Sequence, residues 1–341
     1  MKYRILPIFI PQYGCPFKCI FCNQKIISGE KEEVTLERIK RQIEEGLKKN
    51  EGEDVELAFY GGNFTAIGFN MQKRLLELAR RFERVKSIRI STRPDFINEE
   101  ILRFLKDYRV KTIELGIQSM FDDVLKASKR GHTAEDSAKA SKLIKWFGFT
   151  LGVQLMVGLP NSTEEKDIKS AEIVCSFEPD IARIYPTLVI EDTYLAEMYR
   201  RGEYQPLSLE DAILISSYMK EIFMANGVKV IRTGLQPTEE INYNARVIAG
   251  PFHPSLGELV DSEIIFRRIT ALFMSRSLKK LSIFVHPKNF SKLIGNKKRN
   301  IERLRKEYGF QDIEIFTDHE DENTIRILTG DREMVVDIRG L

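Results

Sequence analysis

The first three-quarters of the sequence alternates short apolar segments with longer amphipathic ones, and this alternation restricts the fold more than any other feature. The apolar segments predict seven strands, at Ile5–Ile10, Val55–Tyr60, Ser87–Ser91, Thr112–Ile117, Thr150–Val157, Ile181–Thr187 and Val228–Ile231. The segments between them carry apolar residues at helical spacing. Strands joined by helices form parallel, right-handed units. We therefore expect an α/β fold, a partial or complete parallel (β/α) barrel with its chemistry at the carboxyl ends of the strands.

The pattern changes near residue 275, after a predicted helix over residues 262–278. The remaining residues predict a small α+β module in the order strand, helix, helix, strand, strand, at Leu281–Val285, Asn289–Ile294, Arg299–Tyr308, Asp312–Phe316 and Thr324–Leu328. The sequence thus predicts two domains, a barrel over residues 1–275 and a smaller domain over residues 276–341.

Charge is distributed unevenly over the predicted second domain. Residues 276–311 carry eleven Lys and Arg against two Glu, a net charge of +9, whereas residues 312–341 have a net charge of −6. The basic residues centre on the loop between the two short helices. A basic block of this kind suits contacts with nucleic-acid phosphates, and a solvated helix face is the alternative interpretation.

Composition excludes several classes of protein. With 43% apolar and 30% charged residues, the chain is neither collagen-like nor wholly disordered. No apolar run approaches the ~18 residues of a membrane span, and the first residues are too weakly apolar for a signal peptide. We expect a cytoplasmic protein without membrane contacts.

Three of the four cysteines, Cys15, Cys19 and Cys22, lie within eight residues directly after the first predicted strand. Thiolates at this spacing can surround one metal centre from a single loop. A structural zinc site needs four ligands, whereas a [4Fe–4S] cluster held by three Cys leaves one iron open to a substrate or cofactor. Three buried or zinc-bound cysteines are the alternative. The fourth, Cys175, lies in a helical segment and is interpreted as a small buried residue.

The spacing Cys-x3-Cys-x2-Cys after a first strand resembles the radical S-adenosylmethionine (SAM) superfamily. The resemblance continues in order at later strand ends, in Phe59–Thr65, Ser91–Pro94, Glu114–Ser119, Lys129–His132 and Gln154–Pro160. It implies a [4Fe–4S] cluster on Cys15, Cys19 and Cys22, SAM as second cofactor, and a reducing donor such as ferredoxin or flavodoxin. In that superfamily an electron from the cluster cleaves SAM to methionine and a 5′-deoxyadenosyl radical, which abstracts hydrogen from the substrate.

The same resemblance implies which residues contact SAM. They are Phe21 beside the adenine, Gly61, Gly62 and Asn63 near the methionine, Gln118 and Arg130 at the ribose and carboxylate, and Ser91 and Gln154 at neighbouring strand ends. Because paired glycines let the backbone approach a ligand closely, we expect Gly62→Val to exclude SAM while leaving the cluster intact.

One further segment, Ile184–Ile190, is similar to the radical SAM portion of the Elongator catalytic subunit. That relative modifies wobble uridine in tRNA and has an acetyltransferase-like domain that binds acetyl-CoA. This sequence has no pattern for such a domain, so we expect no acetyl-CoA chemistry. Residues 250–259 predict an ordered loop whose His253 and Glu258 lie either over the active site or in a turn with satisfied polar groups.

The C-terminal module resembles a KH domain, an RNA-binding fold in which a GxxG loop joins two helices and clamps the nucleic-acid backbone. Gly295 to Lys298 occupy the position of that loop, with Lys298 in place of the final Gly. The resemblance implies RNA contacts by Lys297, Lys298 and Arg299.

Three hypotheses follow for the function. The first, which we favour, is a radical SAM enzyme that modifies RNA, in particular tRNA. The second is a radical SAM enzyme for a small molecule such as a tetrapyrrole. The third is a zinc-stabilised RNA-binding protein without catalysis. Iron analysis distinguishes the third hypothesis from the others, and RNA binding distinguishes the first two.

Overall fold

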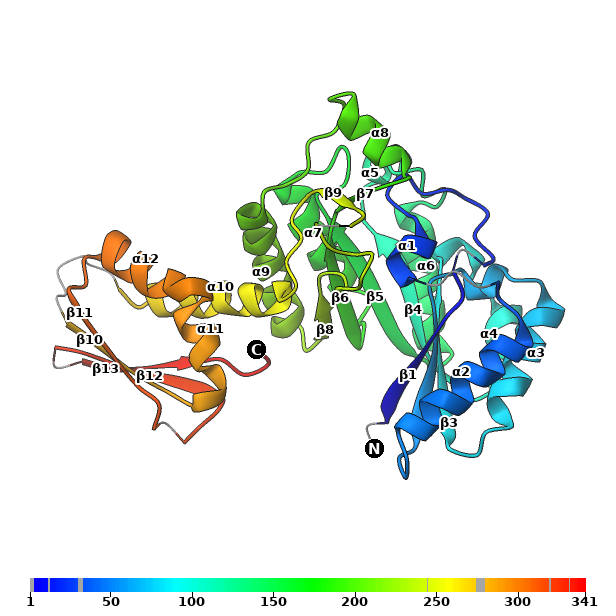
Figure 1. Cartoon of the computed structure of the whole chain (residues 1–341), viewed down its shortest axis with the longest axis horizontal. Helices are drawn as coiled ribbons and strands as arrows, with labels where there is room; N and C mark the ends of the chain where they lie inside the picture. The colour runs from blue at the N-terminus through cyan, green and yellow to red at the C-terminus, as the bar shows by residue number, and fades with distance from the viewer. Residues whose placement is uncertain are drawn as a thin grey trace.

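A seven-stranded parallel sheet forms the centre of the larger part of the chain (Figure 1). The structure, a computed structural model, describes residues 3–11, 13–29, 33–243, 245–273, 280–318, 320–330 and 332–341. The strands follow the order β1-β2-β3-β4-β5-β6-β8, with bounds Arg4–Phe9, Val55–Tyr60, Val85–Thr92, Val110–Gln118, Thr150–Val157, Ile181–Pro186 and Lys229–Thr233. The seven predicted strands are confirmed. The curved sheet stays open between β1 and β8, so the barrel is partial.

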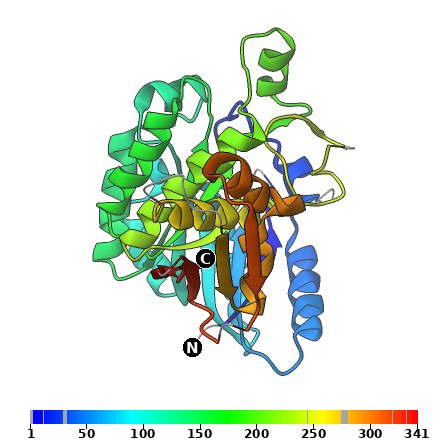
Figure 2. The same ribbon diagram turned by 90° about the vertical axis from the view of Figure 1, so that its left-hand side faces the viewer.

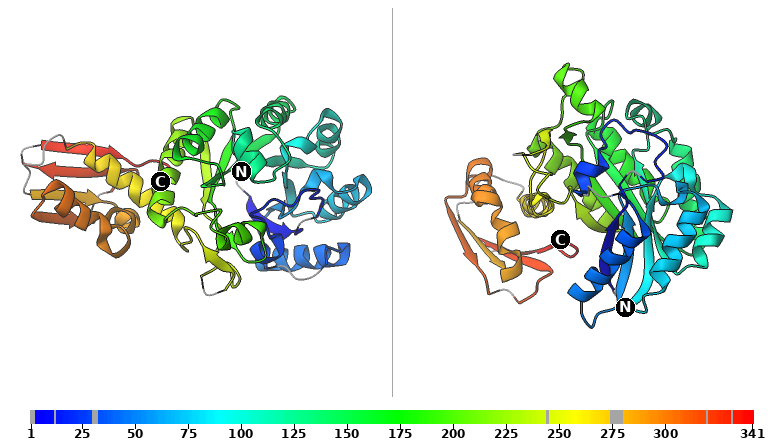
Figure 3. Two further views of the ribbon diagram at one scale, coloured as in Figure 1. Left: turned by 90° about the horizontal axis from the view of Figure 1, so that it is seen from above. Right: turned by 45° about the vertical axis from the view of Figure 1, so that its right-hand side comes forward.

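Helices between the strands cover the outer face of this sheet (Figure 3). They are α2 (Leu36–Lys49), α3 (Phe69–Arg80), α4 (Glu99–Lys106), α6 (Ala134–Trp146), α7 (Glu164–Cys175) and α9 (Leu209–Ala225). Hydroxyl side chains begin several of them: Thr35 caps α2, and Thr133 forms a capping box with Asp136 at the start of α6. Such caps satisfy backbone N–H groups that lack a partner in the first turn.

The two faces of the sheet have different chemistry. Side chains directed toward the helices, such as Ile8, Leu57, Ile90 and Leu155, are fully or almost fully buried and build the main apolar core. The inner face carries polar and aromatic side chains instead. Along β6 the half-buried Ile181, Arg183 and Tyr185 alternate with buried Ala182 and Ile184. The alternation places the polar side chains of β6 inside the half-barrel.

Shorter elements lie beyond the carboxyl ends of the strands (Figure 1). These are α1 (Gln24–Ser28), α5 (Asp122–Ala127), α8 (Tyr194–Arg200) and an antiparallel pair of β7 (Val189–Ile190) with β9 (Val247–Ala249). The cysteine loop runs between β1 and α1 at the same edge. This is the edge at which the sequence places the chemistry.

The smaller part is a four-stranded sheet with helices on one face (Figure 2). Its order is β11-β10-β12-β13, and its elements are β10 (Lys280–Val285), α11 (Phe290–Ile294), α12 (Arg299–Tyr308), β11 (Asp312–Phe316), β12 (Thr324–Thr329) and β13 (Arg332–Asp337). The β-α-α-β-β order expected from the sequence is present. The last strand, β13, was not expected.

Helix α10 (Leu256–Thr270) contributes to the cores of both parts. Its Val260 and Ile264 pack with Ile213 of α9, whereas Phe266 and Ile269 belong to the core of the smaller part. The sequence predicted the start of this helix at residue 262, whereas α10 begins at Leu256. Glu258 lies in its first turn, so the prediction that Glu258 belongs to a loop is wrong. The predicted boundary near residue 275 falls at 274–279, outside the described residues.

Among the helices that the structure describes, none combines the length and apolar character needed to cross a membrane.

Candidate active site

The cysteine loop is held against the loop that follows β2 by direct backbone packing. A Cβ atom on Gly62 would lie 2.6 Å from the Tyr13 carbonyl oxygen and 2.7 Å from that of Ile10. Asn63 N–H also donates to the Tyr13 oxygen at 2.9 Å. The reason given for the expected effect of Gly62→Val is therefore wrong. A valine there would collide with the cysteine loop before it reached any cofactor.

The three thiols lie on this loop, Cys15 exposed and Cys19 and Cys22 half-buried, with no disulfide among them. Burial, and next the neighbouring Cys19, raises the pKa of the Cys22 thiol to about 12. Binding of iron must therefore displace a proton from this thiol. Within the described chain, no three Cys, His, Asp or Glu side chains are arranged to hold a single metal ion.

Arg130 connects the cysteine loop to the fourth strand. Its Nη1 donates to Cys19 Sγ at 3.1 Å and its Nη2 to the Gly116 carbonyl oxygen at 2.6 Å. The side chains of Arg130 and Gln118 lie close over Gly116, where a Cβ would be 2.9 Å from Gln118 Nε2 and 3.3 Å from Arg130 Nη2. The guanidinium thus lies beside a cysteine sulfur at the end of β4, where the sequence predicted a cofactor contact.

His132, two residues further on, is buried against the same strand end. Its Nε2 lies 3.2 Å from the Ile117 carbonyl oxygen. Burial, and then the charges of Arg130 and Arg93, lower the pKa of His132 to about 3, so the ring is neutral. Within the described residues, His132 Nδ1 and Arg130 Nε are buried without a hydrogen-bond partner. Unpartnered buried polar atoms beside three free thiols fit a site built for a further polar group.

Other predicted cofactor contacts meet at the same edge. Gln154 Nε2 donates to Gln118 Oε1 at 3.1 Å, and Gln118 has a left-handed backbone with φ of 72°. Phe21 packs against the small buried cluster of Val124, Met156 and Leu159. Ser91 is half-buried on β3. The structure therefore brings Phe21, Gln118, Arg130 and Gln154 to one edge of the sheet, beside the cysteines.

Asn63 lies differently from the other predicted contacts. Its side chain is fully buried, and its Oδ1 accepts a hydrogen bond from Thr92 Oγ1 at 2.6 Å. The amide therefore joins the ends of β2 and β3. Arg93, which follows Thr92, pairs with Asp95 at 2.8 Å. Its guanidinium lies over the Phe17 ring of the cysteine loop, 4.6 Å from the ring centre. The sequence analysis assigned no role to Arg93.

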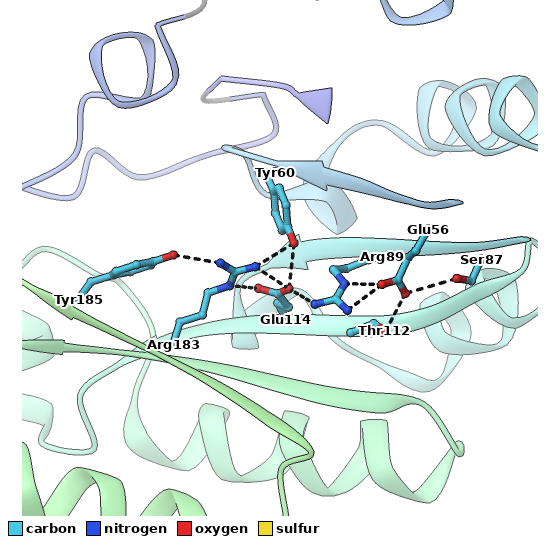
Figure 4. A network of polar contacts seen from close by, with 8 residues as sticks. All are labelled: Glu56, Tyr60, Ser87, Arg89, Thr112, Glu114, Arg183 and Tyr185. Carbon is cyan, nitrogen blue, oxygen red and sulfur yellow. Dashed lines mark hydrogen bonds and ion pairs between the residues drawn. The ribbon is translucent and has the colours of Figure 1, made fainter. Parts of the chain in front are cut away.

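A buried network of charged side chains, which the sequence analysis also missed, lies on the inner face of the sheet (Figure 4). At its centre Glu114 accepts hydrogen bonds from Arg89 Nη1 and from Arg183 Nε, each at 2.7 Å, and from Tyr60 Oη at 3.2 Å. Toward one end, Arg89 donates to Glu56 at 2.7 Å. The other residues of the network are Ser87 and Thr112 beside Glu56, and Tyr185 beside Arg183.

Paired charges stabilise this network. Burial alone would raise the pKa of Glu114, but Arg183 and Arg89 outweigh it and lower the pKa below its ordinary value. Two arginines and two glutamates sum to no net charge. Removal of one partner would leave a buried charge without compensation, at a cost of about 3–5 kcal/mol. A sequence signal existed: Glu56, Arg89, Glu114 and Arg183 each interrupt an apolar strand.

Two other residues singled out in the sequence, Cys175 and His253, take no part in the contacts described above. Cys175 is 9% exposed at the end of α7 and belongs to the main apolar core, in agreement with its interpretation as a buried residue. His253 Nδ1 accepts a hydrogen bond from Ser255 N at 3.1 Å, as a turn residue does. The adjacent Phe252 packs with residues of α1 behind the cysteine loop.

The predicted RNA-binding residues lie together on the loop between α11 and α12. Lys297, Lys298 and Arg299 are exposed, and the two lysines have left-handed backbones with φ of 51° and 63°. Arg299 lies 3.6 Å from Glu210 of α9. Within the described residues no ion pair includes Lys297 or Lys298.

This basic loop is attached to the barrel through α10. Asp261 contacts Lys220 of α9 and Lys292 of α11, the latter at 3.1 Å. Glu263 pairs with Arg303 of α12 at 2.6 Å. Asn300 Nδ2 donates to the Ser262 carbonyl oxygen at 3.1 Å, next to Gly295. The acidic side of α10 thus binds cations of the module, so the net charge of +9 overstates what is free for RNA.

Comparison with known proteins adds to this geometry. The radical SAM superfamily matches residues 9–173, and the radical SAM C-terminal domain matches residues 179–265. The tRNA uridine(34) acetyltransferase of Methanocaldococcus jannaschii is 35% identical over 229 residues, which cover 60% of this chain and 41% of that protein. Mouse Elongator complex protein 3 is 33% identical over 147 residues, covering 42% of this chain and 27% of that protein.

A solved structure of Methanocaldococcus infernus Elp3 with an N-terminal deletion is similar with a TM-score of 0.62 and 25% identity. The match covers 95% of this chain and 73% of that one. The chain spans about two-fifths of the length of the archaeal acetyltransferases that it matches, 42% and 41%. The resemblance to radical SAM proteins, and to the Elongator subunit among them, is confirmed.

Proposed function

The chain belongs to the radical SAM superfamily, whose enzymes use a [4Fe–4S] cluster and SAM, and from this premise we propose that it modifies tRNA. The observation that carries the proposal is the attachment of a basic helix–loop–helix to the radical SAM barrel through contacts with α10. A named relative that acts on tRNA supports the choice of RNA. Uridine 34 and acetyl transfer belong to that relative and form no part of the proposal.

Cys15, Cys19 and Cys22 are the proposed ligands of the cluster. When bound, the cluster and SAM supply reductive cleavage of SAM to methionine and a 5′-deoxyadenosyl radical. Arg130 holds the Cys19 sulfur from the side of β4. Gln118, Gln154 and Phe21 bind SAM beside it, and the loop of Gly61 and Gly62 fixes the cysteine loop in place.

Substrate enters at the carboxyl edge of the sheet, where the cysteine loop and the proposed SAM contacts lie. Lys297 and Lys298 bind tRNA phosphates, and the fixed contact between α10 and α12 determines where the RNA lies relative to the barrel. A ferredoxin or flavodoxin is the proposed electron donor.

The proposal is tested by comparing the modified nucleosides of tRNA from cells with and without the gene. We expect at least one nucleoside to disappear from the tRNA when the gene is deleted, and to return when the gene is restored but not when Cys19→Ala replaces it. Unchanged tRNA, together with the loss of a small metabolite, would favour the small-molecule hypothesis.

A further inference from the structure

Tyr185 is the residue of the buried charge network that also packs near the cysteine loop. It follows Arg183 by two residues on β6, so both side chains point into the half-barrel, as Figure 4 shows. Its ring packs against Val124, Met156 and Leu159, the cluster against which Phe21 of the cysteine loop also packs. Tyr185 thus links the network to the cluster that also contacts Phe21.

The hydrogen-bond inventory of the network leaves donors unused at this end. Arg183 Nε and Nη2 donate to Glu114, Nη2 also to Tyr60 Oη at 2.9 Å, and Nη1 to Tyr185 Oη at 3.3 Å. Arg183 has five N–H groups and a phenol has one O–H. Among contacts of the described residues, the second Nη1 hydrogen and the Tyr185 hydroxyl hydrogen have no acceptor. Two donors therefore lie side by side inside the half-barrel.

The charge of the network indicates which acceptor they suit. Glu56 and Glu114 compensate Arg89 and Arg183, so the network attracts an anion weakly. A phosphate or carboxylate would lose its hydration without gaining a free positive charge. A neutral carbonyl oxygen loses little hydration and accepts two hydrogen bonds. Uracil, guanine and cytosine carry such an oxygen, and adenine does not.

We propose that Tyr185, oriented by Arg183, donates a hydrogen bond to a carbonyl oxygen of the nucleobase that enters the half-barrel. The inference rests on the proposed action on tRNA and adds the residue that binds the base. Proteins that act on a base extrude it from its stack and bind it between apolar side chains and hydrogen-bond donors. Met156 and the Tyr185 ring supply the apolar surface here, next to Phe21 of the proposed SAM site.

Tyr185→Phe tests the proposal because it keeps the ring and removes only the hydroxyl. The probe is unfractionated tRNA from a strain that lacks the gene. The measured quantity is the ratio of 5′-deoxyadenosine formed with and without this tRNA. One hydrogen bond of ordinary strength supports a fall in this ratio of about three- to tenfold. Bound iron per chain and the Kd for tRNA should equal those of the unaltered protein.

Tyr204→Phe is the matched control, because its hydroxyl is buried, donates to the Gly158 oxygen at 2.7 Å, and lies outside the network. This variant should keep the ratio of the unaltered protein. An unchanged ratio in Tyr185→Phe would overturn the proposal while leaving action on tRNA intact. Loss of iron in Tyr185→Phe would also overturn it, since Tyr185 would then serve the cluster. If the unaltered protein forms no more 5′-deoxyadenosine with tRNA than without it, the proposed function fails, and this inference fails with it.

Discussion

The loop between α11 and α12 makes the strongest quantitative prediction. Lys297→Gln with Lys298→Gln removes two charges and keeps an unbranched, polar side chain at both positions. The two lysines are exposed, and no ion pair among the described residues uses them. Glutamine at these left-handed positions costs the backbone about as much as lysine does, so the loop should keep its shape.

The size of the effect follows from release of counterions. Each phosphate contact with a single strand contributes about 0.7 to the slope of log K against log salt. The double variant should therefore flatten the slope by about 1.4. Arg299 already lies beside Glu210, so Arg299→Gln should change the slope by less than about 0.7.

The assay is tRNA binding measured by fluorescence anisotropy over a series of salt concentrations. Lys48→Gln with Lys49→Gln is the control, because these lysines are adjacent and exposed at the end of α2, far from the module in sequence. The control should keep the slope of the unaltered protein. A slope for the double variant equal to that of the unaltered protein would refute RNA binding by this loop. The same slope change in both would show that the charge acts non-specifically.

Three further predictions concern the barrel. Cys19→Ala should abolish bound iron, whereas Cys175→Ala should keep it, as measured by iron analysis after anaerobic reconstitution; iron loss in Cys175→Ala would contradict the ligand assignment. Gly62→Val should lower both the iron content and the Tm, because its Cβ meets the cysteine-loop backbone, whereas Gly68→Val, with open space around it, should keep the iron content. Burial raises the pKa of Asp167 to about 6. Between about pH 4 and 6 the folded state holds a proton that the unfolded state has released. The free energy of unfolding should therefore fall by up to about 3 kcal/mol as the pH rises through this range. Urea titrations of Asp167→Asn should show no such pH dependence.

Strand positions and the cysteine edge were predictable because they depend on local patterns. Apolar runs of four to eight residues between polar helices predict parallel strands, and parallel strands bring their carboxyl ends together. The ends of the fourth and fifth predicted strands were therefore expected at one edge, and there the structure places the amides of Gln118 and Gln154 3.1 Å apart.

The inner face was harder to predict, because its contacts depend on register between strands far apart in sequence. Glu114 and Arg183 are 69 residues apart, and only the pairing of β4, β5 and β6 brings them together. The direction of the Asn63 amide was also not predictable, since it depends on Thr92 at the end of the next strand. Strand β13 was missed because its charged residues obscure the apolar alternation around Val336.

The central claim is that this radical SAM barrel acts on tRNA delivered by its C-terminal module. The most direct measurement incubates the reconstituted protein with SAM, a reductant and tRNA from a strain that lacks the gene, and analyses the nucleosides of that tRNA by mass spectrometry. The account predicts a nucleoside that appears only with all three components, and not with Cys19→Ala. Formation of 5′-deoxyadenosine with no change in any nucleoside of that tRNA would contradict it.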